Sequence, residues 1–313
     1  MNVIGVDIGG TKCSVVLGDN KANVFKKSKF KTTTLDGTLK KIIEAVKNFG
    51  ECDAIGISCG GPLDVERGII MSPPNLPGWD NVHITELLEE SFDVPVFLKN
   101  DADACAIAEW KFGAGKGTKN MIFITFGTGL GAGLILNGQI YSGACGSAGE
   151  IGHIRLSENG PVGYGKSGSF EGFCSGGGIA QLAGTMAREW LQMGKPVSYC
   201  DSLDKLSELT AKSVAEKATE GMEDAIKVYR YCGEMLGKGL SILIDILNPE
   251  KIVIGSIFAR SESLLREEMQ RVINRECLES AAKACEIVPA MLGENIGDVA
   301  ALSVAIDALS KEI

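Results

Sequence analysis

A glycine-rich turn near the N-terminus carries the residue types that hold phosphate. It consists of Gly9, Gly10, Thr11 and Lys12, and it lies between two short apolar runs typical of strands. Glycines let backbone N–H groups approach a ligand closely, while the Thr hydroxyl and the Lys ammonium add further donors to phosphate oxygens. Asp7 ends the first run and could hold Mg²⁺ through water. The alternative interpretation of this segment is an ordinary hairpin in which Asp7 is a solvated acid. The spacing of its glycines matches neither a P-loop nor a Rossmann turn.

The same pattern occurs again in the middle of the chain. An apolar run at residues 121–126 leads into Gly127, Thr128 and Gly129, and a second apolar run follows at 130–136. Asn-Gly at the end of this run is a strong hairpin signal. Two turns of the same phosphate-binding type in one chain indicate a duplicated α/β architecture with one such turn in each half.

A third candidate group is the pair Asn100 and Asp101. An apolar run at 94–98 precedes the pair, and an Ala-rich helical segment at 102–112 follows it. Ligands of open α/β sheets bind beyond the carboxyl ends of strands, and a carboxylate placed there can accept a proton from a substrate hydroxyl. The simpler reading is that Asp101 only caps the helix.

The elements that must position these groups follow from apolar spacing and from turn residues. A buried strand at 54–59 runs into a turn that contains Gly61, and the Pro-rich loop 72–79 contains Asn75 and Trp79, which could line a pocket or belong to a rigid surface loop. Thr85 is a possible cap of the helix that follows this loop. Strands are further expected at 23–31, 139–141, 251–254 and 285–289, and helices at 35–49, 84–91, 179–193, 206–208, 214–219, 222–247, 264–272 and 297–310.

Composition limits the classes of function. The chain has 313 residues, 45% of them hydrophobic, and a net charge of −9 from 40 acids and 31 bases. Without a long basic run, no nucleic-acid partner is expected. No apolar run approaches the ~18 residues of a membrane span, and no signal peptide is visible, so a cytoplasmic protein without membrane contact is expected. The ten cysteines, scattered without C-x-x-C pairs, are read as free thiols.

Taken together, the motifs resemble those of the ROK family, which comprises sugar kinases and repressors. The matching segments are D-I-G-G-T-K, G-G-P-L-D, N-L-P-G-W, K-N-D-A-D-A, F-G-T-G-L-G-A-G-L-I-L-N-G and G-E-I-G-H, in that order. The resemblance implies an actin/hexokinase-like duplicated fold of two α/β domains with a cleft between them. The smaller domain would comprise residues 1–113 plus about 297–313, the larger one residues 114–296, with a hinge at Gly113–Lys119. Family repressors carry an additional N-terminal helix-turn-helix domain, for which there is no room before Val3, so the kinase branch is expected.

The resemblance also implies a role for each matching residue. Asp101 corresponds to the general base that takes the proton from the sugar hydroxyl. The sugar would be bound by Asn100, Glu150, His153 and Glu171, under loops that contain Gly61 and Asn75. The turns at 9–12 and 127–129 would bind the phosphates of ATP with Mg²⁺, and Gly255 would lie at the nucleotide. A homodimer is implied as well.

One segment departs from the family pattern. The family commonly follows its G-H pair with three cysteines that bind a structural zinc, whereas residues 162–171 read V-G-Y-G-K-S-G-S-F-E and contain no Cys. Cys145 and Cys174 flank the segment, and with His153 they remain one ligand short of the four that structural zinc requires. We therefore expect no zinc site, and a loop at 160–172 that is held by turns and packing.

The function expected from these features is ATP-dependent phosphorylation of a hexose at the 6-hydroxyl. Glucose is the first choice because N-L-P-G-W resembles the glucokinase-type members. N-acetylmannosamine, N-acetylglucosamine, fructose and allose remain open as substrates, and polyphosphate remains open as the phosphoryl donor. The alternative from another class is a non-catalytic sugar-sensing regulator without a DNA-binding domain.

Overall fold

The computed structural model describes residues 1–311, and the chain forms two compact units. The first unit comprises Met1–Phe123, Gly133–Ala148 and the C-terminal segment from Met291, and the second comprises Ile124–Ala132 and Gly149–Ala290. Residues 114–123 and 133–148, which the sequence analysis placed in the second domain, thus have most of their contacts in the first unit.

The first unit contains a five-stranded sheet with the order β3-β2-β1-β4-β8. Strands β1 and β2 form the predicted antiparallel hairpin, in which Asp7 lies opposite Ser14, and β4 and β8 continue the sheet in parallel. The carboxyl ends of β1, β4 and β8 therefore lie at one edge, where the sequence places Asp7, Gly60 and Asn100. The strands are β1 (Asn2–Ile8), β2 (Lys12–Asp19), β3 (Val24–Lys31), β4 (Ala54–Cys59) and β8 (Val96–Asn100).

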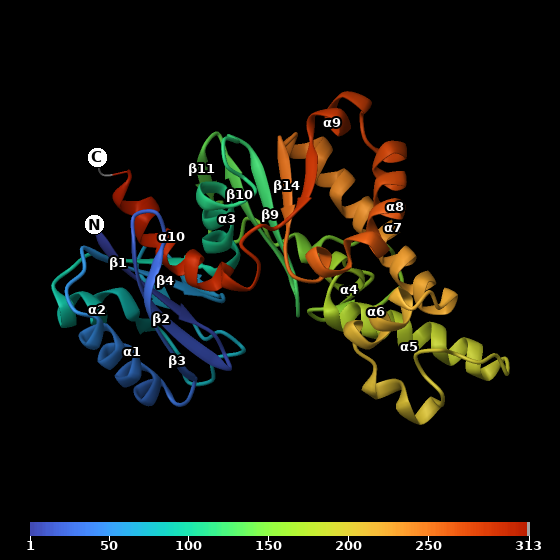
Figure 1. The fold of residues 1–313 in the computed structure, drawn as a ribbon, viewed down its shortest axis with the longest axis horizontal. Helices are drawn as coiled ribbons and strands as arrows, with labels where there is room; N and C mark the ends of the chain where they lie inside the picture. The colour runs from blue at the N-terminus through green and yellow to red at the C-terminus, as the bar shows by residue number, and fades with distance from the viewer. Residues whose placement is uncertain (312–313) are drawn as a thin grey trace. The chain divides into compact units, whose positions relative to one another are not determined.

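Helices cover both faces of this sheet (Figure 1). Helix α1 (Leu35–Phe49) packs on one face, and helices α10 (Ile296–Leu309) and α3 (Asp101–Phe112) pack on the other. A Cβ at Gly5 would lie 2.7 Å from the backbone N of Leu302, so glycine is what allows α10 to approach the strand backbone directly. The sheet and these helices fix the position of the β1–β2 turn.

A second five-stranded sheet has the order β11-β10-β9-β14-β15, which repeats the pattern of the first. In both sheets a hairpin adds antiparallel strands on one side and parallel strands follow on the other. The repeated topology supports the duplication that the two glycine turns indicate. The strands are β9 (Met121–Phe126), β10 (Leu130–Leu136), β11 (Gln139–Tyr141), β14 (Lys251–Ile254) and β15 (Glu286–Pro289).

The remaining elements surround these sheets. Small strands form a three-stranded sheet, β5 (Leu63–Asp64), β6 (Ile69–Ile70) and β7 (Val82–His83), and a two-stranded one, β12 (Val162–Gly163) and β13 (Lys166–Ser167). The other helices are α2 (Ile84–Phe92), α4 (Phe170–Phe173), α5 (Gly176–Gln192), α6 (Ala211–Thr219), α7 (Glu223–Leu247), α8 (Ile257–Glu276) and α9 (Glu279–Ala284), with 3₁₀ turns at Ile151–His153, Leu203–Glu208 and Gly293–Asn295.

Several local predictions were wrong, among them the helix expected at 264–272, which comprises Ile257–Glu276, and the helix expected at 214–219, which begins at Ala211. The cap position of α2 is His83 without a side-chain hydrogen bond, and not Thr85. Helix α5 begins at Gly176 instead of residue 179, because the Ser175 hydroxyl accepts the N–H of Gly178 and starts the helix within the glycines. Trp79, expected either in a pocket or on a rigid surface loop, is fully buried in a hydrophobic core that also contains Leu76 and Ile84, so the surface alternative is wrong.

Among residues 1–311, no helix combines the length and the apolar character needed to cross a membrane.

Candidate active site

The turn between β1 and β2 is closed by its own backbone. Gly9 donates its N–H to the carbonyl of Lys12 at 3.2 Å, and the carbonyl of Gly9 accepts the Thr32 hydroxyl at 2.6 Å. The Thr32 N–H in turn donates to the Thr11 carbonyl at 3.1 Å. Thr32, which directly follows β3, therefore holds the predicted phosphate turn in place, while Thr11 and Lys12 are exposed.

The loop after β6 brings Asn75 to this turn. Gly10 is packed so closely on the backbone and Cβ of Asn75 that a side chain at position 10 would collide with them. A Cβ at Gly60 would lie 3.7 Å from Asn75 Nδ2, so the amide of Asn75 reaches the end of β4 as well. Within the first unit, a residue predicted to bind sugar thus contacts the turn predicted to bind phosphate.

Asn100 and Asp101 lie where β8 passes into α3. Asn100 is the helix cap, because its Oδ1 accepts the N–H of Ala102 at 2.9 Å, and Asp101 is the first helical residue. A Cβ at Gly60 would lie 3.9 Å from Asp101 Oδ2, and one at Gly61 would lie 3.5 Å from Asn100 Nδ2. The Ala102 N–H is also accepted by Asp101 Oδ1 at 2.8 Å, so both side chains contact the start of the helix, while Asp101 Oδ2 lies toward Gly60.

Burial and neighbouring charges shift the pKa values of the two candidate carboxylates, Asp7 and Asp101. Burial, followed by the charges of Asp101 and Asp298, raises the pKa of Asp7 to about 6, and Lys12 and Lys27 oppose that rise. Burial also raises the pKa of Asp101, although N–H groups at the start of α3 favour its charged form. A carboxylate with a raised pKa is a better proton acceptor near neutral pH, which is what a general base needs.

Asp7 fits a Mg²⁺ ion held through water. It is a half-buried carboxylate beside the phosphate turn, and a cation there would offset the repulsion from Asp101 and Asp298. Residues 1–311 contain no cluster of three or more His, Cys, Asp or Glu side chains placed to bind a metal. The ion would therefore depend on Asp7, water and the phosphates of the donor.

The sequence analysis did not identify a buried acid next to Asp7. The Asp298 side chain accepts the Ser14 hydroxyl at 3.2 Å and forms an ion pair with Lys27. A Cβ at the preceding residue, Gly297, would lie 3.3 Å from Asp7 Oδ2, so the start of α10 is in contact with the carboxylate of Asp7. The sequence did offer one signal for Asp298, the G-D pair at the start of the last apolar helix. The contact between Ser14 and Asp298, however, spans 284 positions in the sequence and leaves no local pattern.

In the second unit, Glu171 lies against the second glycine turn. Its Oε2 accepts the N–H of Leu130 at 3.0 Å, and a Cβ at Gly129 would lie 2.8 Å from the same oxygen. Gly152, between Glu150 and His153, packs on the Leu130 carbonyl and on Glu171. The second unit thus brings Glu171, the 127–129 turn and the segment of Glu150 and His153 together.

Glu150 and His153 are exposed at the two ends of the 3₁₀ turn at Ile151–His153. The imidazole of His153 contacts the Tyr164 ring edge-on, with the ring centroids 5.2 Å apart, and Lys166 Nζ donates to the His153 carbonyl at 2.6 Å. These contacts come from the loop in which the family commonly carries its zinc-binding cysteines. The absence of zinc at this loop remains a prediction.

Three separate segments meet at the second glycine turn. The Gly127 carbonyl accepts the N–H of Gly176 at 2.8 Å, and a Cβ at Gly127 would lie 3.4 Å from Ser256 Oγ. Gly255 donates to the Ile124 carbonyl at 2.9 Å, which fixes the predicted nucleotide-side residue beside β9. The N-terminus of α5 was missed by the sequence analysis, although the run S-G-G-G before an apolar segment is typical of helix starts that accept anions.

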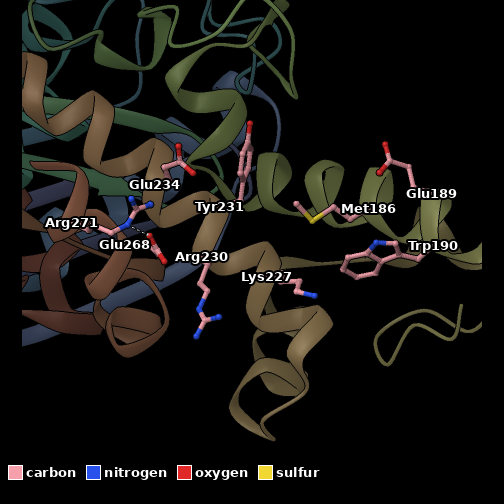
Figure 2. Close-up of a pocket in the computed structure, with 9 residues that line it drawn as sticks. All are labelled: Met186, Glu189, Trp190, Lys227, Arg230, Tyr231, Glu234, Glu268 and Arg271. Atoms are coloured by element: carbon pink, nitrogen blue, oxygen red, sulfur yellow. Dashed lines mark hydrogen bonds and ion pairs between the residues drawn. The ribbon is translucent and has the colours of Figure 1, made fainter. Parts of the chain in front are cut away.

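A cavity of about 400 Å³ on α5, α7 and α8 is separate from these residues (Figure 2). It contains none of the residues predicted to bind sugar or nucleotide, and its charges partly neutralise one another, as in the pair of Arg271 Nε and Glu268 Oε2 at 2.6 Å. Its lining consists of Met186, Glu189, Trp190, Lys227, Arg230, Tyr231, Glu234, Glu268 and Arg271.

Known proteins resemble the chain over almost its whole length. A glucokinase of Halalkalibacterium halodurans is 33% identical over 307 residues, which cover 94% of this chain and 92% of the relative. A xylose repressor of Caldicellulosiruptor bescii is 27% identical, over 88% of this chain and 70% of the repressor.

Solved structures share the fold. A ROK hexokinase from Thermus thermophilus superposes with a TM-score of 0.82 at 26% identity, over 99% of this chain and 100% of that one. A ROK family glucokinase from Streptomyces griseus, in complex with glucose and AMPPNP, gives a TM-score of 0.74 at 28% identity, over 98% of this chain and 100% of that one. The fold is accordingly the α/β actin/hexokinase-like one. The sequence matches the ROK family over residues 3–308, and the chain belongs to this family.

Proposed function

We propose that this protein transfers the γ-phosphoryl group of ATP to the 6-hydroxyl of a hexose, and that glucose is its preferred substrate. An ATP-dependent sugar kinase is supported by the glucokinase relative and by the ROK structure that binds glucose and AMPPNP. The choice of glucose rests on those relatives and on the N-L-P-G-W loop. The observation that carries the proposal is the position of Asp101 beside Asn75 and Asn100, in the same unit as the 9–12 turn that Asn75 contacts.

The chemistry requires a proton acceptor and groups that neutralise charge. Phosphoryl transfer depends on positioning and electrostatic stabilisation more than on covalent steps. The sugar oxygen forms a bond to the γ-phosphorus as the bond from that phosphorus to the β-phosphate oxygen breaks, and Asp101 takes the hydroxyl proton. Its raised pKa supports this role, because the proton then moves to an acceptor of suitable strength.

The other residues have binding roles in this proposal. Asn75 and Asn100 offer amide groups that both donate and accept, which suits neighbouring sugar hydroxyls. Glu150, His153 and Glu171 are proposed to bind sugar hydroxyls as well. The turns at 9–12 and 127–129 bind phosphates with their N–H groups, and Gly255 contacts the nucleotide. When bound, Mg²⁺ at Asp7 supplies charge neutralisation on the phosphates.

We further infer a homodimer, which sedimentation equilibrium would measure.

A second candidate function is that of a sugar-sensing regulator without catalysis. The observation that favours it is the similarity to a xylose repressor at 27% identity. A regulator needs the sugar-binding residues but neither Asp101 nor the phosphate turns. The intact set of Asp101, Gly9–Lys12 and Gly127–Gly129 therefore favours the kinase.

A coupled assay of ADP release over a panel of sugars separates the two candidates. The panel contains glucose, fructose, allose, N-acetylmannosamine and N-acetylglucosamine. We expect the highest kcat/KM with glucose. Sugar binding in calorimetry without ADP release from any sugar would favour the regulator, and a higher kcat/KM with another sugar would overturn the choice of glucose.

A further inference from the structure

A short hairpin in the second unit lies against two of the proposed sugar-binding residues. It consists of β12 and β13, and the two residues at its tip, Tyr164 and Gly165, have positive φ angles of 45° and 75°. Positive φ at both positions of a two-residue loop is typical of a type I′ turn, which matches the twist of the two strands. The hairpin occupies the loop in which the family commonly carries its zinc-binding cysteines.

The backbone of the hairpin packs on Glu171, and its tip contacts His153. A Cβ at Gly163 would lie 2.8 Å from the Cβ of Glu171 and 2.5 Å from the N of Gly172, so β12 lies directly on the segment that carries this carboxylate. The Tyr164 ring meets the His153 imidazole edge-on at a centroid distance of 5.2 Å. The position of the hairpin therefore affects both proposed sugar-binding side chains.

The amide of Gln181, on α5, pairs with the free edge of the hairpin. Its Oε1 accepts the N–H of Val162 at 2.9 Å, and its Nε2 donates to the Val162 carbonyl at 2.9 Å. The residues that flank a two-residue turn exchange backbone hydrogen bonds, so the next pair, Val162 and Ser167, directs these groups away from the hairpin. Gln181 thus bonds Val162 as a third strand would.

Helix α5 can hold the hairpin because it is itself packed on the segment of Glu171. Gly178, about one turn before Gln181, is buried, and a Cβ there would lie 2.9 Å from the Glu171 carbonyl oxygen. By contrast, the Ser167 hydroxyl donates within the loop, to the Gly160 carbonyl at 3.0 Å, and does not tie the hairpin to another element. Gln181 therefore links the hairpin to a helix that is already fixed beside Glu171.

We propose that Gln181 is a positioning residue for sugar binding, because its amide holds β12 against Glu171 and the hairpin tip against His153. The inference rests on the proposed function, in which these two residues bind sugar hydroxyls. A side-chain amide on a helix thus fixes this loop, where the family commonly uses cysteines and zinc. Because Gln181 and Val162 are exposed, water competes for the two hydrogen bonds, and their loss should have moderate effects.

The test compares three variants of helix α5. Gln181→Met keeps the length of the side chain and removes both hydrogen bonds to Val162. Gln181→Glu retains an acceptor for the Val162 N–H but places a carboxylate oxygen against the Val162 carbonyl. Gln192→Met is the matched control, because it makes the first substitution at an exposed glutamine at the end of the same helix.

Hydrogen exchange measures the hairpin without reference to activity. Mass spectrometry of peptides that contain residues 162–167 should show exchange faster by about 5- to 100-fold in Gln181→Met, as expected for the loss of two neutral hydrogen bonds. Gln181→Glu should be intermediate and Gln192→Met unchanged. Wild-type exchange in Gln181→Met would overturn the proposal, and so would an equal increase in peptides of α7, which would indicate a general loss of stability. Wild-type protein whose hairpin opens equally on zinc chelation would also overturn it.

Steady-state kinetics tests the consequence for the sugar. With the sugar that gives the highest kcat/KM, we expect Gln181→Met to raise the sugar KM by about 3- to 30-fold with little change in kcat, the pattern of lost binding. An unchanged sugar KM in a variant whose hairpin opens faster would overturn the positioning role and leave the kinase function intact. Wild-type protein that releases ADP with no sugar would contradict the kinase function, and sugar affinities from calorimetry would then replace KM in the same comparison.

Discussion

The carboxylate of Glu171 accepts a hydrogen bond from the backbone N–H of Leu130 at 3.0 Å. Leu130 directly follows the 127–129 turn, so a group proposed to bind sugar also fixes the backbone proposed to bind phosphate. Hydrogen bonds to charged groups contribute about 1.5–3 kcal/mol. We therefore expect Glu171→Ala to raise the KM for ATP as well as the KM for sugar, by roughly ten- to 100-fold for sugar.

Glu171→Gln is the matched control, because its amide oxygen can still accept the Leu130 N–H. Steady-state kinetics should show a KM for ATP close to that of the wild type for this variant. An ATP KM unchanged in Glu171→Ala would show that the hydrogen bond does not support the turn.

His153 should keep a fixed orientation through Tyr164. The two rings meet edge-on at a centroid distance of 5.2 Å, and a ring edge this close shifts the resonances of its neighbour. Since the chain has only two histidines, removal of the other by His83→Gln leaves a single imidazole to observe by NMR. In that background we expect Tyr164→Leu to shift the His153 resonance and to raise the sugar KM with little change in kcat.

Tyr164→Phe retains the ring and should behave like the parent protein. Identical His153 resonances in the Leu and Phe variants would remove Tyr164 from this positioning role.

Zinc should be dispensable. His153, Cys145 and Cys174 supply at most three ligands, whereas structural zinc sites use four. Activity should therefore survive a strong zinc chelator when Mg²⁺ is in excess. Elemental analysis that finds about one zinc per chain, lost together with activity on chelation, would contradict this expectation.

Activity should depend on pH through two carboxylates whose pKa values are raised. Asp101 must be unprotonated to accept the hydroxyl proton, and Asp7, with a pKa of about 6, must be charged to hold Mg²⁺. Because protonation disables both groups, kcat/KM should fall as the pH decreases, and the decline should begin near pH 6 and not near the usual carboxyl value. The residual rate of Asp101→Asn should show a shallower acid limb. Profiles of equal steepness would indicate that Asp101 does not titrate in the reaction.

The sequence predicted best where apolar periodicity and a turn signal coincide. The strands at 121–126, 130–136 and 54–59 have the predicted bounds, because each is an apolar run that ends at a turn signal, which is glycine after 126 and 59 and Asn-Gly after 136. The repeated glycine turn also predicted a duplicated architecture, which the repeated strand order of the two sheets supports. Local pattern alone was sufficient for these elements.

Contacts between distant residues could not be predicted in this way. The Ser14–Asp298 bond and the burial of Trp79 depend on packing between segments far apart in sequence. The same holds for Glu109, a buried residue whose carboxylate accepts the Ala114 and Leu292 N–H groups at 2.8 Å each. It fixes the glycine-rich segment that the sequence indicated as a hinge. Nothing in the A-E-W-K-F-G pattern marks this acid as buried.

The position of the transferred phosphoryl group tests the role of Asp101 most directly. Wild-type protein and Asp101→Asn are incubated with ATP, Mg²⁺ and either glucose or 6-deoxyglucose, and the products are identified by ³¹P–¹H correlation NMR. We expect glucose 6-phosphate from the wild type, no phosphorylated product from 6-deoxyglucose, and a rate lower by about 10²–10⁴-fold in Asp101→Asn. Phosphorylation of 6-deoxyglucose, or near-normal turnover in Asp101→Asn, would contradict the assignment of Asp101 as the base that activates the 6-hydroxyl.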